Sequence, residues 1–500
     1  MVAAASIAFV PRASDASSYD AVLYPARPFV QTHPDRLATL ATLFGLKPPR
    51  PGVCRVLELG CGAGGNLLPM AAALPGATFA GIDNASVPIA RARSLAERLG
   101  LSNVHFDEIS IEEYEPPAEG FDYVIAHGVY SWVTDPVRDA LLTLCARAVS
   151  RHGVAYVSYN ALPGGHLRQA LREMLAFHLG EISAPDERIA AARGFLGLLN
   201  AAGESDDDLA TRLGPEAREL FDHDDALLFH DTLADFNRPF YFHDFIARAE
   251  AHGLQFLSEA QFSEMQVGAL SRSLQRKLLA IPDPLRREQY LDFLKERKFR
   301  QTLLCHADCT LDGTPRPETL RALAVSAALR WKADEQSGRV TFVGPGNAHV
   351  ITDHPLVVRT LETIGRGWPS PVWIAQLGSE GELPAICDAL LRCFGANLVR
   401  LHVHPPLVST IAPERPRVSP VARLEAAAGT MLTTVRHTHY QLDDDLGRRV
   451  AALLDGTRDR PALLAALQDD GASADDDLAA AIDASLARLA GAGLLLCDEP

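Results

Sequence analysis

Apolar and helical segments alternate along the first third of the chain. Amphipathic stretches separate five apolar runs, which lie at 54–60, 78–83, 104–106, 123–128 and 154–160. Strand-like runs that alternate with helices at this spacing are typical of a parallel sheet with helices on both faces. Two further strands are expected at 254–260 and 301–307. The pattern therefore predicts an α/β fold built on one seven-stranded sheet.

Breaks in this pattern divide the chain into several parts. The run at 166–235 has mostly helical periodicity, and Gly, Pro and Thr cluster at 310–319 as they do in linkers. Beyond the linker a small mixed region precedes several short helices and a terminal apolar run, which suit a winged helix. The predicted parts are an N-terminal arm and lid helix (1–50), a ligand-binding sheet domain (51–310) with a helical insertion at about 166–240, a small α/β domain (311–410) and a winged-helix-like domain (411–500).

Length and charge narrow the classes of partner. The 500 residues are too many for one hydrophobic core, which agrees with several domains. The chain has 63 Asp and Glu against 47 Lys and Arg, a net charge of −16, so a nucleic-acid backbone would be repelled and no nucleic-acid partner is predicted. No window approaches the roughly 20 apolar residues that span a bilayer, and the first residues lack a secretory signal pattern. A cytoplasmic protein without stable membrane insertion is expected.

The cysteines predict neither disulfides nor a metal centre. Eight are scattered without a repeated CxxC spacing, which suits reduced thiols. Cys305, His306 and Cys309 could contribute to a zinc site, but no second Cys/His pair follows at a finger-like spacing. No metal is therefore predicted.

A glycine-rich loop follows the first predicted strand. The segment LELGCGAGGN places Gly60, Gly62 and Gly64 at a strand-to-helix turn, where missing side chains let a ligand approach the backbone. Gly60, Gly62 and Gly65 also satisfy the dinucleotide pattern GxGxxG, and Asp83 stands near the position of its ribose-binding acid. The loop alone does not separate these cofactors.

Glu58, two residues before the first glycine, favours a ligand without phosphate. A carboxylate there would repel a pyrophosphate but would attract the ammonium of S-adenosylmethionine. The two oxygens of Asp83 can accept both ribose hydroxyls of the same cofactor. These features together favour a class I methyltransferase with S-adenosylmethionine as its cofactor.

The loops after the third and fourth strands supply further candidates for cofactor binding. The segment FDEISIEEY would lie beside the adenine, with Ser110 where many such enzymes carry Asp, and with backbone groups of Ile109 and Ile111 available for contacts. His127, at the end of the fourth strand, either contacts the cofactor carboxylate or hydrogen-bonds a loop.

Aromatic residues at the strand ends are candidates for the acceptor side. Tyr130 and Trp132 follow the fourth strand, Tyr159 ends the fifth, and Tyr24 lies on the N-terminal arm. Such rings can surround a sulfonium or a methylated ammonium by cation–π attraction, whereas the alternative for each is packing at the domain rim. Asn160 could accept a hydrogen bond from an amine and so orient it. We therefore predict Tyr130, Trp132, Tyr159 and Asn160 as acceptor-side residues.

The sequence resembles the bacterial protein lysine methyltransferases that modify outer-membrane proteins, with their relatives that carry a methyltransferase regulatory domain. The resemblance covers nearly the whole chain, most specifically its first half, and rests on SYDAVLYPARPFVQTHPDRLATLATLFG, LELGCGAGGNLLPMA, FDYVIAHGVYSWV, VSYNALPGG, NRPFYFHDFIARAEAHGLQFLSEA, YLDFLKERKFRQTLLC and LDGTRDRPAL. It implies a methyltransferase fold, a helical region associated with the regulatory domain, a C-terminal winged helix and a protein lysine as the acceptor. One departure is Gly165, where the family pattern leads us to expect an aromatic residue.

Other functions stay open at this point. A small-molecule O- or N-methyltransferase would use the insertion as a pocket lid, and a protein that senses S-adenosylmethionine without turnover would share the same loop. A homodimer is also open. Because the predicted sheet closes before the linker, residues after Pro315 are expected to be dispensable for cofactor binding but not for action on a protein substrate.

Overall fold

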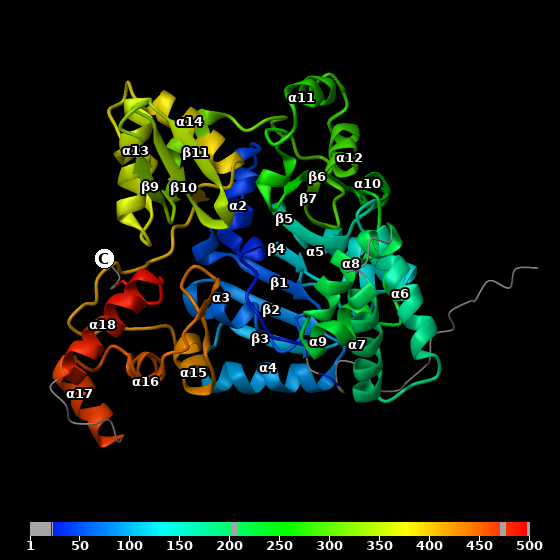
Figure 1. The fold of residues 1–500 in the computed structure, drawn as a ribbon, viewed down its shortest axis with the longest axis horizontal. Coiled ribbons are helices and arrows are strands. Elements are labelled where there is room, and N and C mark those ends of the chain that lie inside the picture. Colours follow the sequence, from blue (N-terminus) through cyan, green and yellow to red (C-terminus); the bar gives the residue numbers. More distant parts are fainter. Residues whose placement is uncertain (1–21, 23, 203–207, 471–476, 498–500) are drawn as a thin grey trace, which may run out of the picture.

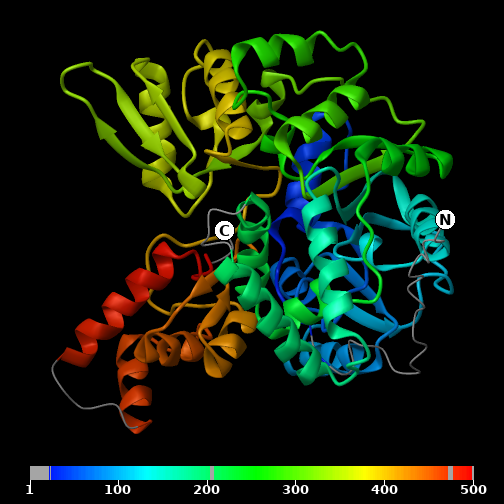
Figure 2. The ribbon, with the colours of Figure 1, turned by 45° about the vertical axis from the view of Figure 1, so that its right-hand side comes forward.

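A seven-stranded sheet lies at the centre of the computed structural model, which describes residues 22, 24–202, 208–470 and 477–497. A helical region flanks the sheet on one side, and two smaller C-terminal domains flank it on the other (Figure 1; Figure 2). The strand order is β3-β2-β1-β4-β5-β7-β6, and β7 runs antiparallel to both of its neighbours. The strands are β1 (Arg55–Leu59), β2 (Thr78–Asp83), β3 (Val104–Glu108), β4 (Phe121–Ala126), β5 (Val149–Asn160), β6 (Leu254–Glu259) and β7 (Phe299–His306). The predicted seven-stranded class I methyltransferase sheet is confirmed.

The direction of strand addition reverses between β1 and β4. β1 pairs in parallel with β2 on one side and with β4 on the other. Loops that leave the carboxyl ends of β1 and β4 therefore diverge, which creates the crevice where open α/β sheets bind ligands. Glu58 and His127 both lie at this edge.

Side-chain alternation along the strands divides the core between the two faces of the sheet. Val56 packs on the face covered by α2 (Pro34–Leu43), α3 (Leu67–Ala73) and α4 (Ser86–Arg98). Leu57 packs on the face covered by α5 (Asp135–Ala148) and α10 (Phe242–Ala251). Short 3-10 turns connect these elements: η1 (Val30–Thr32), η2 (Pro51–Val53), η3 (Tyr130–Trp132) and η5 (Phe262–Met265).

The region between β5 and α10 is helical, as predicted, and has a core of its own. Its leucines, among them Leu171, Leu196 and Leu220, form a separate apolar cluster. Two further helices, α11 (Arg272–Leu279) and α12 (Pro284–Lys295), connect β6 to β7. The insertion consists of α6 (His166–Leu179), α7 (Pro185–Ala202), α8 (Asp208–Phe221), α9 (Asp225–Leu227) and the π-helix η4 (Leu228–Thr232).

Two small domains follow the sheet. The α/β domain contains η6 (Pro317–Ala322), β8 (Ala324–Ser326), β9 (Arg330–Ala333), β10 (Val340–Val343), η7 (Pro345–Asn347), β11 (His349–Thr352), α13 (Pro355–Gly367), β12 (Val372–Trp373), η8 (Ile374–Gln376), α14 (Leu383–Gly395) and β13 (Arg400–His402). The last domain contains α15 (Pro420–Ala428), β14 (Met431–Thr433), β15 (His439–Gln441), α16 (Asp445–Leu453), α17 (Arg460–Asp469) and α18 (Asp477–Gly491). The expected terminal strand is reduced to isolated bridges, in which Leu495 and Leu496 pair with Val418 and Val408.

Helix α2 is a core helix and not the predicted lid. Leu37 and Leu40 are fully buried in one apolar cluster that also contains Val325 and Leu401 of the small α/β domain. The two carboxylate oxygens of Asp35 accept hydrogen bonds from that domain. One is 2.8 Å from the His402 side chain, and the other is 2.7 Å from the His404 backbone amide. A chain of residues 1–310 would expose this shared face to water, which is contrary to the expectation that residues after Pro315 are dispensable for cofactor binding.

Candidate functional site

The glycine loop after β1 has the backbone conformation that only glycine adopts easily. Gly60, Gly62 and Gly64 have φ values of 71°, 51° and 75°. A Cβ atom at Gly60 would lie 2.6 Å from a methyl group of Val129. The Gly62 amide donates to Asp83 Oδ2 at 2.9 Å, so the loop and the end of β2 are held together.

Asp83 is fixed by backbone donors on both carboxylate oxygens. Oδ2 accepts from the Gly62 amide, and Oδ1 accepts from the Ala85 amide at 2.9 Å. The side chain lines the same cavity as the glycine loop. This placement, at the end of the strand next to the loop, is the one predicted for a ribose-binding acid.

Glu58 and Asn66 form a buried polar pair beneath the loop. Asn66 Nδ2 donates to Glu58 Oε1 at 2.7 Å, and both side chains are 4% exposed. Glu58 Oε2 is buried with no hydrogen-bond partner among the described residues. Burial is the main cause that raises the pKa of Glu58 to about 8. An unpaired buried acceptor of this kind fits the ammonium group of an amino-acid ligand.

A cavity of about 920 Å³ opens over these residues. The N-terminal arm forms part of its wall: the Phe29 ring lies 3.9 Å from the His127 ring, and the Phe29 amide donates to Asn66 Oδ1 at 3.0 Å. A Cβ atom at Gly65 would lie 2.5 Å from the Ala26 backbone, so the arm approaches the loop closely. The extended arm, rather than helix α2, borders the ligand space.

The third-strand loop lines the expected adenine end of the cavity. Ile109, Ser110 and Ile111 all contribute to this wall. The Ile109 amide already donates to the Asp83 carbonyl at 2.9 Å, so it is not available to a ligand as predicted. Ser110 Oγ donates to Glu113 Oε2 at 3.0 Å. Of the two predicted residues, Ile111 is the remaining candidate for a backbone amide donor.

His127 lines the cavity and is held by hydroxyl groups behind it. Its Nδ1 lies 2.9 Å from Tyr156 Oη and 3.3 Å from Ser158 Oγ. Burial lowers the pKa of His127 to about 4, so the ring is neutral at pH 7. A neutral ring does not supply a positive charge for the cofactor carboxylate.

Only two of the four predicted acceptor-side residues reach the cavity. Trp132 and Asn160 line it, whereas Tyr130 and Tyr159 are fully buried. Tyr159 stacks on Phe245 with ring centroids 4.2 Å apart. Alternation explains the error for Tyr159, because Ala155, Val157 and Tyr159 share the face that packs on α5 and α10. The prediction that Tyr130 and Tyr159 face the acceptor is wrong.

The backbone around Gly165 is too tightly packed for a side chain. A Cβ atom there would lie 2.8 Å from the Ala161 carbonyl oxygen and 3.3 Å from Pro239. An aromatic residue would require a different path of the loop after β5. The departure from the family pattern therefore has a local structural reason.

Several cavity residues were not predicted from the sequence. Asn66 directly follows the glycine loop, and this position in the sequence was the one signal that could have identified it as a cavity residue. The others come from the arm, the end of β2, helix α4, the insertion and the residues at the start of β7, which only the tertiary fold brings together. They are Arg27, Phe29, Asn84, Arg91, Arg168, Glu219, Asp231, Lys298 and Phe299.

The described residues contain neither a cluster suited to a metal ion nor a helix suited to cross a membrane. No group of three or more His, Cys, Asp or Glu side chains within the described part of the chain is arranged to hold a metal ion. None of the described helices is long and apolar enough to cross a bilayer.

Comparisons with known proteins agree with this architecture. Family models match for a methyltransferase domain at 56–153, a predicted methyltransferase regulatory domain at 224–306 and the C-terminal winged helix domain of PKMT at 414–480. The regulatory-domain match overlaps only the end of the predicted 166–240 insertion and continues through β6, α11, α12 and β7.

Similar proteins cover most of the chain. The uncharacterized protein RP789 of Rickettsia prowazekii is 40% identical over 377 residues, which are 73% of this chain and 68% of that protein. The structure of PKMT2 from Rickettsia typhi has a TM-score of 0.83 at 26% identity and covers 94% of this chain and 100% of that chain. Its complex with AdoHcy gives the same TM-score and identity over 94% and 99%. The fold and the site define an S-adenosylmethionine-dependent methyltransferase. The chain belongs to the bacterial protein lysine methyltransferase family with a methyltransferase regulatory domain and a C-terminal winged helix.

Cofactor affinity should increase as the pH rises toward the pKa of Glu58. The Glu58 carboxyl is mostly protonated below its pKa of about 8, whereas pairing with the cofactor ammonium requires the carboxylate. Binding below that pH therefore releases a proton, and affinity should rise by up to about tenfold per pH unit. Calorimetry in buffers of different ionisation enthalpy measures this proton.

Glu58→Gln is the matched control for the pH effect. It keeps the hydrogen bond from Asn66 but has no carboxyl to ionise, so it should bind more weakly and show only the pH dependence of the cofactor's own amine. Equal proton release by the wild type and the variant would exclude Glu58 as the titrating group.

Proposed function

We propose that the enzyme methylates lysine side chains of a protein substrate. The observation that carries this proposal is the composition of the cavity wall near the ends of β4 and β5. Asn160, Trp132, Phe299 and Asp231 line the cavity there. This wall combines an amide and a carboxylate, which suit an amine, with aromatic rings, which suit its alkyl stem and its methylated ammonium.

Asn160 is the residue best placed to orient an amine. Its Nδ2 donates to Asn237 Oδ1 at 3.1 Å, which fixes the amide plane. No hydrogen bond between described residues uses Asn160 Oδ1, so this acceptor is available to an N–H group. The Trp132 indole Nε1 is likewise buried with no partner in the described structure.

Asp231 is the titratable acid at this end of the cavity. Burial raises its pKa to about 6, and Tyr24 Oη donates to its Oδ2 at 3.4 Å. At pH 7 the group is mostly ionised and attracts a lysine ammonium. Lys298 and Arg168, which also line the cavity, are both paired with Glu216 and Glu219. Arg172 donates to the Asp231 carbonyl, and its charge lowers the pKa of Asp231 in part. Asp231 therefore adds electrostatic attraction for a cationic acceptor.

Methyl transfer places modest demands on these residues. The bound cofactor supplies a methyl group that its sulfonium already activates, so the protein mainly aligns the nucleophile with it. A lysine amine, with a usual pKa of about 10.4, must first lose its proton to solvent water, and burial in the cavity favours the neutral form. Asn160 then holds the amine, and the hydrophobic walls exclude water.

Similar proteins support a protein acceptor. The structure of PKMT2 matches almost the whole of this chain, including the two C-terminal domains. Incubating host-cell protein with the enzyme and labelled S-adenosylmethionine, followed by mass spectrometry of peptides, tests the proposal. Methylated lysines are expected; label that enters only small molecules would contradict it. A cytoplasmic location, a homodimer and the absence of nucleic-acid contacts stay predictions.

Asn160→Ala should lower turnover and leave cofactor affinity nearly unchanged. The residue aligns only the nucleophile, so its loss acts mainly in the transition state, and misalignment of this kind costs roughly 100-fold in kcat. Single-turnover methylation and calorimetry measure the two quantities separately.

Tyr159→Phe is the control for Asn160→Ala. It removes a hydroxyl that lies 3.3 Å from Thr302 Oγ1 in the core and leaves the stacked ring in place. Turnover should stay close to the parental rate. Parental turnover in Asn160→Ala, or a loss of cofactor binding equal to its loss of activity, would contradict the assignment.

A further inference from the structure

A second cavity, of about 730 Å³, lies where the sheet domain meets both C-terminal domains. Its wall includes residues of helix α2, the end of α3, strand β13 and the beginning of the last domain. Five arginines contribute to this wall: Arg36, Arg400, Arg417, Arg423 and Arg436. The cavity is thus rich in positive charge although the chain carries a net charge of −16.

Two carboxylates also line this cavity, and both are occupied elsewhere. Asp35 accepts hydrogen bonds from the His402 ring and from the backbone amide of His404. Asp455 accepts from Arg458 Nη1 at 2.7 Å and from the Thr457 hydroxyl at 2.5 Å. Neither acid forms an ion pair with an arginine of the cavity.

The cavity arginines lack anionic partners in the part of the chain that the structure describes. Arg423 Nε and two nitrogens of Arg436, Nε and Nη1, are buried without a hydrogen-bond partner. The Arg36 Nε donates to the neutral Ala260 carbonyl at 2.8 Å, and Arg36 forms no ion pair with a described residue, although the charge of Asp35 acts on it. The side chains of Arg400 and Arg417 form neither hydrogen bonds nor ion pairs with described residues.

The guanidinium group of Arg400 is near enough to repel those of Arg36 and Arg436. Burial, and then the charge of Arg400, lowers the pKa of Arg436 to about 9 and that of Arg36 to about 10. Arg436 also stacks on Trp368 at 3.6 Å, which holds its guanidinium plane in place. Unpaired buried charge is costly, and an anion within the cavity would offset that cost.

We propose that this cavity binds a small organic polyanion that carries phosphate or carboxylate groups. Arginine presents planar paired donors that match both groups, and several arginines around one space favour more than one anionic group. The volume exceeds that of a single phosphate ion, and Leu74, Pro406 and Val418 supply apolar wall for an organic part. The site is separate from the cofactor cavity, since the two share no lining residue.

Calorimetry on the full-length protein tests the proposal. S-adenosylhomocysteine is kept saturating, so that the cofactor cavity is closed to competitors, and ATP, pyrophosphate and citrate are titrated separately. At least one probe should bind in the micromolar range and weaken with added salt. ATP or pyrophosphate binding without citrate binding would identify phosphate as the recognised group, and the reverse would identify carboxylate.

Substitutions locate the site. Arg400→Met keeps an apolar stem but removes an unpaired charge, so it should fold with an unchanged or higher Tm and bind the probe at least tenfold more weakly. Arg417→Gln is a second test. Because Arg417 is exposed, this substitution should leave folding unchanged. Arg392→Gln is the control, because Arg392 is exposed and pairs with Asp388 outside the cavity. Its affinity should equal that of the wild type.

Two results would overturn the proposal. One is a failure of the binding test: either the wild-type protein binds none of the three probes, or the Arg400 and Arg417 variants bind a probe as tightly as the wild type does. The other concerns Asp498 and Glu499, which follow the cavity-lining Cys497 in the sequence and lie outside the described residues. If only a chain shortened to end at Cys497 binds the probes, the chain's own acids occupy the cavity and no external polyanion is required.

Discussion

Asp83→Ala is expected to weaken S-adenosylmethionine binding by at least about 100-fold. A hydrogen bond to a charged group contributes about 1.5–3 kcal/mol, and two ribose hydroxyls would lose the same carboxylate. The alanine also releases the amides of Gly62 and Ala85, which the carboxylate fixes at 2.9 Å. Both effects act on the cofactor and not on the acceptor. Calorimetry with S-adenosylhomocysteine measures the loss without turnover.

Asp83→Asn separates these two effects. The asparagine retains an oxygen that can accept from one amide, so the loop stays ordered while the negative charge is lost. Its affinity should fall between those of the wild type and Asp83→Ala. A loss below about threefold in Asp83→Ala would show that the side chain does not contact the ribose.

The sheet could be predicted from the sequence because its signals are local. Each strand is an apolar run bounded by turn residues, and each connecting helix has its own periodicity. The same holds for the placement of Glu58, Gly62 and Asp83, which follows from their spacing around one strand-to-helix turn. Local order along the chain was therefore sufficient to bring these three residues to one cavity, but not to predict the arm or the contact between Asn66 and His437.

The acceptor half depends on contacts that local patterns do not contain. Tyr159 and Asn160 are neighbours in sequence, yet alternation sends the first into the core and leaves the second at the cavity. Asp231 and Phe299 reach the same space from the helical insertion and from β7, the last strand of the seven-stranded sheet along the chain. No spacing rule connects residues so far apart.

Asn66 shows how the C-terminal domain becomes part of the cofactor site. His437 donates from Nε2 to Asn66 Oδ1 at 2.8 Å, and the Asn66 amide donates to Glu58. His437 is 3% exposed, and burial holds its pKa well below the usual value, so the ring is neutral. A residue of the last domain thus helps to orient the acid beneath the glycine loop. This contact is a further reason why residues 1–310 alone do not reproduce the complete site.

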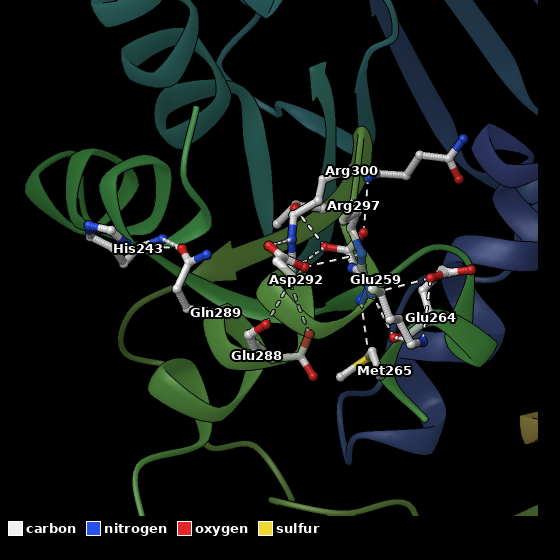
Figure 3. A network of polar contacts seen from close by, with 12 residues as sticks. His243, Glu259, Glu264, Met265, Glu288, Gln289, Asp292, Arg297 and Arg300 are labelled. Atoms are coloured by element: carbon white, nitrogen blue, oxygen red, sulfur yellow. Dashed lines mark hydrogen bonds and ion pairs between the residues drawn. The ribbon is translucent and has the colours of Figure 1, made fainter. Parts of the chain in front are cut away.

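Arg300→Ala should cause the largest loss of stability, about 3–5 kcal/mol, because it leaves buried carboxylates without their counter-charge. Figure 3 shows Arg300 among acids from β6 and α12. It donates to Glu259 at 2.6 Å, to Glu288 at 3.1 Å and to Asp292 at 2.8 and 2.9 Å. Its guanidinium also lies 3.9 Å above the Phe242 ring. The network joins α12 and β6 to β7. The first residue of β7, Phe299, lines the cofactor cavity.

The pH dependence of the loss distinguishes broken ion pairs from lost packing. Burial already raises the pKa values of Glu288 and Asp292, and removal of Arg300 would raise them further. A carboxyl pKa raised by folding costs no stability below the ordinary carboxyl pKa of about 4, and the cost grows as the pH rises from there toward the raised value, so the deficit should be largest near pH 7 and should shrink toward about pH 4. Urea unfolding, with hydrogen exchange of the β6 and β7 amides, measures it. Arg392→Ala, which breaks an exposed pair with Asp388, should change stability by less than about 0.5 kcal/mol. A deficit in Arg300→Ala that does not vary with pH would assign the effect to packing on Phe242 instead of to the carboxylates.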